Sequence, residues 1–324
     1  MATTVNKDMI IYNETAQTSF LERRQDNIDV FNNSSNGAII LENEIIQGDF
    51  SQSAFYTVGG EMKHRDVNST DKVTANKIGM SEQVGVKVPY KYGPYVSTEE
   101  AFKRRARSPE EFAYLIGQDL ADATSAGHLE YALGALTGAI LSNSDMNVNG
   151  NIAVDGRKAL TRAMRTFGDK FSRVALWVMN SDTYFDIIDD ALTNQIYSES
   201  GVVIYGGVPG TLGKPVLVTD TIDPKLSFGL QRGAVRIRES QLPSFRLYDI
   251  NDEENMAMGA RAEGAFNIDI LGYSYNKTKG ENPNLEKLKA AASWKKYVAS
   301  NKLTAGVLIN LSKDEKSKPD GIGG

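Results

Sequence analysis

The chain has 324 residues, of which 41% are hydrophobic and 24% are charged, and its formal net charge is −5. At roughly 150 residues per domain, this length suggests about two domains with a core large enough to fold without disulfides. The chain has no cysteine, which excludes disulfides, thiolate metal sites and cysteine nucleophiles. The slightly acidic balance argues against a general nucleic-acid binder, which would carry a basic excess.

Two histidines, His64 and His128, are predicted to lie on different elements, so a zinc centre or a serine–histidine hydrolase is hard to build. The first residues show no basic region followed by an apolar core, so we expect no signal peptide. The longest mostly apolar run, Leu129–Leu141, is shorter than the about 20 residues that a membrane-spanning helix needs. We therefore expect a soluble protein that does not enter a membrane.

Residues 1–40 look irregular, with a short helix expected at Phe20–Arg24 and a polar turn cluster at Asn32–Gly37. Apolar side chains are frequent enough for the segment to dock on another surface, and its composition is not that of a disordered tail.

Residues 38–92 alternate between apolar and polar side chains, which is typical of strands. We predict strands at Ala38–Leu41, Ala54–Val58 and Val84–Tyr90, the last of them stopping near Pro89, with a hairpin signal at Gly59 and Gly60. The connecting residues 65–80 are polar. A long β excursion with little apolar content cannot fold alone, so it must project and another surface must receive it.

The clearest local signal is a capping box in which Ser108 caps a helix, Pro109 fits its first position and Glu111 closes the box. Apolar residues then recur at helical spacing as far as Leu141. This pattern predicts one helix over 109–141, with a length of about 50 Å at 1.5 Å per residue.

Residues 143–223 form a predicted α/β module that begins in a loop rich in Asn, Ser and Gly. Its expected elements are a helix at Val154–Phe167, a buried strand at Val174–Met179, a helix capped by Ser181, and strands at Val202–Tyr205 and Lys214–Thr219.

The remaining chain returns to strands and ends in a polar tail. We expect strands at Ala234–Arg238, Phe245–Tyr248 and Ala265–Tyr275, an amphipathic helix from Pro283 to about Trp294, a last strand at Ala305–Asn310, and a tail at Lys313–Gly324.

The sequence contains no complete motif for catalysis or for phosphate binding. Gly206–Lys214 suggests a phosphate-binding loop, but the spacing is off by one, and Pro215 stands where a magnesium-binding Ser or Thr is needed. His128 is interpreted as a satisfied, partly buried histidine, and Trp177 and Trp294 as core residues. The sequence therefore predicts no active site, no cofactor and no metal.

Three stretches carry a resemblance to a known family: the strand–turn–helix at Arg173–Asp186, the glycine–basic–proline–valine signal followed by aspartate at Leu212–Asp220, and the strand at Phe228–Ala234 that ends in Gly-Ala. Asn282–Trp294 followed by Val307–Asn310 is similar to one subgroup of the same family. Together, and in this order over most of 97–311, these stretches resemble the major capsid proteins of tailed bacteriophages.

The resemblance implies an α+β fold of the Hong Kong 97 type and a structural function without enzymatic activity. It places an N-terminal arm at 1–47, an extended E-loop at 48–92, a P-domain at 93–142 and 224–311 with its spine helix at about 108–141, an A-domain at 143–223, and a polar tail at 312–324. Subunits of this family form pentamers and hexamers of an icosahedral shell around double-stranded DNA. We therefore expect a virion protein that is assembled in the host bacterial cytoplasm.

The resemblance also implies partners: further copies of the chain, a portal, and decoration proteins in some relatives. Because the expected E-loop begins near residue 48, no long N-terminal scaffolding region fits, so a separate scaffolding protein or earlier trimming is expected. DNA would be enclosed without sequence-specific binding. Candidate assembly contacts are basic residues on the excursion and glycines of the axial loop: Lys63, Arg65, Lys72, Lys77, Lys87, Gly206, Gly207 and Gly210.

Two alternatives remain at the level of the sequence. One is the shell of an encapsulin-like nanocompartment, although the typical N-terminal pattern of that family is not visible. The other is a soluble enzyme built on the 143–223 module.

Overall fold

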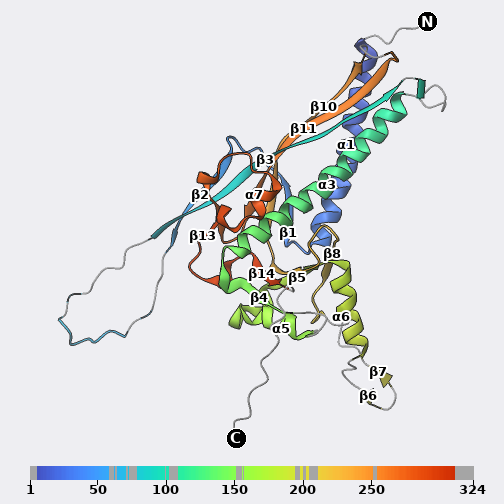
Figure 1. Cartoon of the computed structure of the whole chain (residues 1–324). Helices are drawn as coiled ribbons and strands as arrows, with labels where there is room; N and C mark the ends of the chain where they lie inside the picture. Colours follow the sequence, from blue (N-terminus) through green and yellow to red (C-terminus); the bar gives the residue numbers. More distant parts are fainter. Residues whose placement is uncertain are drawn as a thin grey trace.

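The computed structural model describes residues 6–57, 62, 64–70, 72, 79–98, 100–101, 109–150, 155, 157–193, 198–199, 202–203, 211–250 and 254–310. Within these ranges two sheets are joined by one long helix (Figure 1). The helices are α1 (Asn6–Ser34), α3 (Pro109–Leu141), α5 (Arg157–Arg165), α6 (Ser181–Thr193) and α7 (Leu285–Lys289). Short 3-10 helices are η1 (Ser144–Met146), η2 (Gly168–Arg173), η3 (Lys277–Lys279), η4 (Ala291–Ser293) and η5 (Asn301–Leu303).

The larger sheet contains seven described strands. They are β1 (Ile39–Asn43), β2 (Phe50–Thr57), β3 (Gly79–Thr98), β10 (Val235–Ile250), β11 (Ala257–Ile270), β12 (Tyr273–Tyr275) and β13 (Trp294–Lys296). The order is β1-β10-β11-β12-β13, and β3 pairs with both β11 and β2. The β1–β10 pair is parallel and the other pairs are antiparallel.

The smaller sheet has the order β4-β14-β9-β5-β8. Its strands are β4 (Asn147–Asn149), β5 (Val174–Met179), β8 (Val216–Val218), β9 (Leu226–Gln231) and β14 (Gly306–Asn310). A separate hairpin pairs β6 (Ser198–Glu199) with β7 (Val202–Val203). Segment 143–223 therefore does not close its sheet alone, because β9 and β14 supply two of the central strands.

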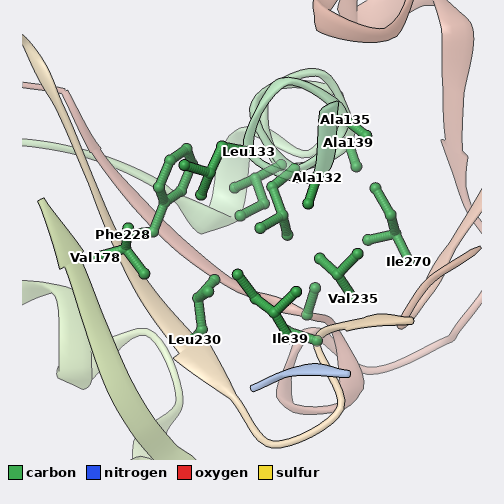
Figure 2. Packing of buried hydrophobic residues seen from close by; sticks show 14 of the residues in the cluster. Ile39, Ala132, Leu133, Ala135, Ala139, Val178, Phe228, Leu230, Val235 and Ile270 are labelled. Atoms are coloured by element: carbon green, nitrogen blue, oxygen red, sulfur yellow. The ribbon is translucent and has the colours of Figure 1, made fainter. Parts of the chain in front are cut away.

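The C-terminal half of α3 packs against both sheets. In Figure 2 its small residues Ala132, Ala135 and Ala139 lie close to side chains of both sheets. The packed residues are Ile39, Val235 and Ile270 from the larger sheet and Val178, Phe228 and Leu230 from the smaller one. Alanine leaves room for branched side chains to approach the helix, so the two sheets share one close-packed core.

The predicted helix over 109–141 is confirmed at both ends, since α3 runs from Pro109 to Leu141. The proposed cap Ser108 lies outside the described residues. The buried strand at Val174–Met179 and the last strand are also confirmed, and Trp177 and Trp294 are core residues as expected.

The expectation of an irregular N-terminal segment is wrong, because residues 6–34 form one helix, α1. Its buried face follows four-residue steps through Ala16, Phe20, Arg24 and Ile28. An arginine in this series interrupts the apolar stripe that would have indicated a helix, so periodicity alone does not find it.

Two strand predictions also need correction. β3 continues through Pro89 to Thr98. Beyond Val88 it pairs only with β11 and is an edge strand, which is a position where a sheet tolerates proline. The two strands expected at 234–238 and 245–248 are one strand, β10, which bends at register shifts between Arg238 and Ser244.

The helix expected from Pro283 to Trp294 is shorter than predicted. Asn284 caps α7 by accepting a hydrogen bond from the Lys287 N–H at 3.0 Å, and the helix ends at Lys289. Trp294 belongs to β13, and its Nε1–H donates to the Leu288 carbonyl at 2.8 Å, which turns the chain back onto the helix.

We predict opposite effects for two alanine substitutions in α3. A Cβ at Gly138 would lie 2.1 Å from the Leu288 carbonyl oxygen, whereas a Cβ at Gly127 meets nothing within 4 Å. Gly138→Ala should destabilise the fold by about 1–3 kcal/mol through overpacking. Gly127→Ala should stabilise it by about 0.5–1 kcal/mol through helix propensity. Urea unfolding followed by circular dichroism measures both, and equal effects would contradict the α3–α7 contact.

Candidate assembly surfaces

The strands β2 and β3 form a ribbon that leaves the body of the molecule (Figure 1). Their pairing runs from Phe50 opposite Val86 to Thr57 opposite Gly79. A two-stranded ribbon has no core of its own, so its position depends on contacts at its base.

The base of the ribbon is fixed around the buried side chain of Asp269. This carboxylate accepts a hydrogen bond from the Ser51 hydroxyl at 2.7 Å and from Nε of Arg238 at 2.9 Å. A Cβ at Gly85 would lie 1.9 Å from the same carboxylate, so only glycine fits there. The Phe50 ring stacks on Tyr275 at 6.3 Å between centroids. The ribbon therefore leaves the body in a defined direction.

The outer part of the ribbon is exposed, including apolar side chains. Met62 is 100% exposed, and Val67 and Met80 are also exposed. Asp66 forms a local turn by accepting the Asn68 N–H at 2.9 Å. Apolar side chains without an internal partner on a projecting segment are typical of a contact surface.

The contact residues predicted from the sequence lie in different parts of the molecule. Arg65 and Lys72 are exposed on the projection, and Lys63 and Lys77 lie outside the described residues. Lys87 lies at the base instead, where its Nζ donates to the Ile46 carbonyl at 3.0 Å. Gly206, Gly207 and Gly210 lie outside the described residues.

The helix α1 lies along the N-terminal half of α3. Its closest approach is at Gly117, where a Cβ would be 2.4 Å from the Ala16 carbonyl oxygen. The Ser19 hydroxyl donates to the Tyr114 carbonyl at 3.1 Å, and Arg23 pairs with Asp122 at 3.0 Å on the exposed side. Phe20 is buried here in a second, smaller core.

A buried ion pair joins α1 to the larger sheet. Arg24 bonds to Glu239 of β10 and to Asn43 of β1, and the side chains of Arg24 and Glu239 are only 8% and 1% exposed. The Tyr90 hydroxyl also donates to Glu239, at 3.3 Å. Burial raises the pKa of Glu239 above its ordinary value, and the charge of Arg24 and both hydrogen bonds offset part of this shift. No local pattern in the sequence indicates this pair, since its partners are 215 positions apart.

A groove of about 770 Å³ lies between α3 and β3, with His128 in its wall. His128 is 3% exposed, and neither ring nitrogen has a hydrogen-bond partner, so the expectation of a satisfied histidine is wrong. Its ring contacts Phe266 edge-on at 4.7 Å between centroids. Burial lowers the pKa of His128 to about 3, so the ring is neutral near pH 7.

Neither a metal cluster nor a membrane-spanning helix occurs in the described part of the chain. No group of three or more His, Asp or Glu side chains in the described ranges could hold a metal ion. The described helices are also not long and apolar enough to cross a bilayer.

Comparison with known families identifies the kind of protein. A family model described as Gp13-like, major capsid protein 13-like, matches residues 8–308. The chain belongs to this family of major capsid proteins. The capsid protein is therefore a structural component of a virion that self-associates into a shell, and it is not an enzyme.

Solved phage structures share its fold at low sequence identity. A Mycobacterium phage Cain structure matches with a TM-score of 0.54 at 9% identity, covering 86% of this chain and 89% of the other. The mature capsid of bacteriophage PhiM1 matches with a TM-score of 0.54 at 8% identity, covering 86% of each chain. Mycobacterium phage Bobi gives 0.51 at 12% identity, covering 83% and 88%. No curated protein matches the chain at a significant level.

These comparisons confirm the mixed helix-and-sheet capsid fold that the sequence resemblance implied. They do not favour the encapsulin-like shell or the soluble enzyme as alternatives.

We predict that Arg24→Met destabilises the capsid protein by about 3–5 kcal/mol near pH 7, because it leaves Glu239 buried without its partner. An unpaired Glu239 binds a proton more readily when folded than when unfolded. The loss should therefore shrink as the pH falls through the raised folded pKa towards the ordinary value of 4.5. Urea unfolding from pH 7 to 4.5 measures this.

The neighbouring residue supplies the control. Arg23→Met removes an exposed ion pair with Asp122 and should change stability little at any of these pH values. Equal losses for the two variants would contradict the anchoring role of Arg24.

Proposed function

We propose that the capsid protein forms the pentamers and hexamers of an icosahedral shell that encloses the double-stranded DNA of a tailed phage. The observation that carries this proposal is the ribbon of β2 and β3, which has a fixed base and an exposed outer part. An element that cannot bury its surface within one chain is suited to lie over a neighbouring subunit.

The proposed division of the chain follows from this arrangement. The ribbon belongs to an E-loop at 48–92, α3 is the spine helix of a P-domain, and 143–223 contributes an A-domain near the symmetry axis. An N-terminal arm at 1–47 and a tail at 312–324 complete it. Assembly in the host cytoplasm with a scaffolding protein and a portal, and later binding of decoration proteins, belong to the same proposal.

Electron microscopy of the expressed protein tests the proposal. Closed particles with fivefold vertices that take up DNA through a portal would support it. Particles that instead enclose a specific protein cargo would indicate a nanocompartment, and a persistent monomer would overturn the proposal.

We predict that shortening the ribbon abolishes closed shells without unfolding the subunit. Thr57 and Gly79 lie opposite each other, so Asn-Gly in place of residues 58–78 closes a hairpin with a two-residue turn. The base contacts of Phe50, Ser51 and Gly85 are retained, and a melting curve close to that of the full chain is the control. Normal shells from the shortened chain, seen by electron microscopy, would contradict the role of the E-loop.

We predict that the loop at 194–213 differs in backbone path between pentamer and hexamer copies, whereas α3 changes mainly by bending. Glycine-rich segments adopt several paths at low steric cost, and one sequence must fit two ring sizes. At the described end of this loop Leu212 and Gly213 both have positive φ, 55° and 71°. Superposing the independent copies of one shell measures this. A loop that is identical in all copies and far from every axis would contradict the A-domain placement.

A further inference from the structure

The smaller sheet separates two segments of opposite charge. Residues 157–173, which contain α5 and η2, carry six basic residues and one acidic residue. Residues 181–193, which form α6, carry four aspartates and no basic residue. In Figure 1, α5 and α6 lie on different flanks of this part of the molecule.

The charges of the basic segment are largely unpaired. The exposed side chains of Lys158, Arg165 and Lys170 have no ion pair in the described structure. Arg162 is paired with Asp155, and the one acidic residue, Asp169, is paired with Lys302. The segment therefore presents a net basic surface, which we call the basic end.

The aspartates of α6 share one face. Asp182, Asp186 and Asp189 are exposed and are spaced by four and three positions, which aligns them along the helix. Asp220 lies beside the start of α6 and accepts the Ser181 hydroxyl at 2.6 Å. Among the described residues of α6 and 219–225 only Lys225 is basic. We call this surface the acidic face.

No ion pair joins the two surfaces among the described residues of one subunit. β5 begins directly after η2 at Val174 and ends at Met179, and one residue, Asn180, separates it from α6. Six residues of strand span about 20 Å at 3.3 Å per residue. The start of α6 is therefore farther from η2 than the screening length of about 8 Å at physiological salt. With no ion pair between them, the charges of each surface remain free to act on another molecule.

An aromatic side chain lies within each charged surface. Phe171 of η2 is 52% exposed between Lys170 and Arg173 in the sequence, and Phe185 of α6 is 61% exposed. Phe185 stands three positions after Asp182 and four before Asp189, so it lies within the row of aspartates. They are the only exposed phenylalanines among the residues whose side chains the structure describes. An exposed aromatic ring surrounded by charge is typical of an interface anchor with a polar rim.

We propose that the acidic face of one subunit binds the basic end of the next subunit in the same ring. Unlike surfaces on different flanks of one subunit suit a head-to-tail contact, and repeated head-to-tail contacts form a ring where the rotation between neighbours closes. A contact between two acidic faces would instead place aspartates against aspartates. The inference rests on the proposed ring assembly and identifies the charged surfaces that hold neighbours together.

Charge reversal tests the contact. Asp186→Lys with Asp189→Lys makes the acidic face basic, and Arg165→Glu with Lys170→Glu makes the basic end acidic. Each double variant should lower the assembled fraction at low salt at least about tenfold, because like charges then meet. The variant that carries all four changes should assemble nearly as well as the original chain, since opposite charges meet again.

Mixing the two double variants gives a second test, which depends on ring size. Matching surfaces meet only where the variants alternate, and alternation closes in a ring of six but leaves one mismatch in a ring of five. Native mass spectrometry should therefore detect hexamers with three copies of each variant, without pentamers.

The matched control for the acidic-face variant is Glu281→Lys with Glu286→Lys, which changes the net charge by the same amount and sign at exposed residues outside both surfaces. This variant should assemble normally, and circular dichroism checks that every variant is folded. Undiminished rings from either double variant, equal loss in the control, or no rescue by the fourfold variant would overturn the contact. If the original chain formed no rings under any condition, the proposed function itself would fail.

Discussion

The packing of α3 between the two sheets is the constraint on which the rest of the structure depends. Its C-terminal half buries alanines against both sheets, and Gly134 and Gly138 let α7 approach on another side. Its N-terminal half carries α1 and Tyr92 of β3, whose hydroxyl bonds to Asp119. One helix therefore sets the positions of the ribbon, the N-terminal helix and the smaller sheet relative to one another.

The surfaces of the molecule follow from this rigid centre. The ribbon is anchored through Asp269, and α1 is anchored through the buried pair of Arg24 and Glu239. A buried pair of this kind is costly to break because either partner alone is a charge without water. These anchors set the directions in which the ribbon and α1 lie relative to the body of the subunit.

Local signals in the sequence predicted the elements whose own residue spacing specifies their secondary structure. The long periodic helix at 109–141 and the buried strand at Val174–Met179 were found because apolar spacing alone specifies them. Helix α1 was missed because Arg24 stands in its buried row and is paired with a residue of β10 that no local pattern reveals. The length of β3 was missed because a strand continues through a proline only at the edge of a sheet, and the sequence does not show that β3 has only β11 beside it at Pro89.

The assembly surfaces were also predictable only where a local pattern specifies them. The projecting ribbon was predictable, because alternation without enough apolar residues indicates a strand pair that needs a partner. The role of Lys87 at its base was not, since that depends on the Ile46 carbonyl in space. The charges beside β5 could be counted in the sequence, but only the fold shows that they form two surfaces that are not joined by an ion pair among the described residues.

The anchor of α1 also sets an order of events during synthesis. Arg24 leaves the ribosome 215 residues before Glu239. At 5–20 residues per second, that delay is roughly 10–40 s. Within this interval α3 leaves the ribosome and can cover Ala16 and Phe20, whereas the strands β10 and β11 that complete their core are not yet made. The first helix of the chain can therefore pack on α3 before its buried ion pair with β10 can form.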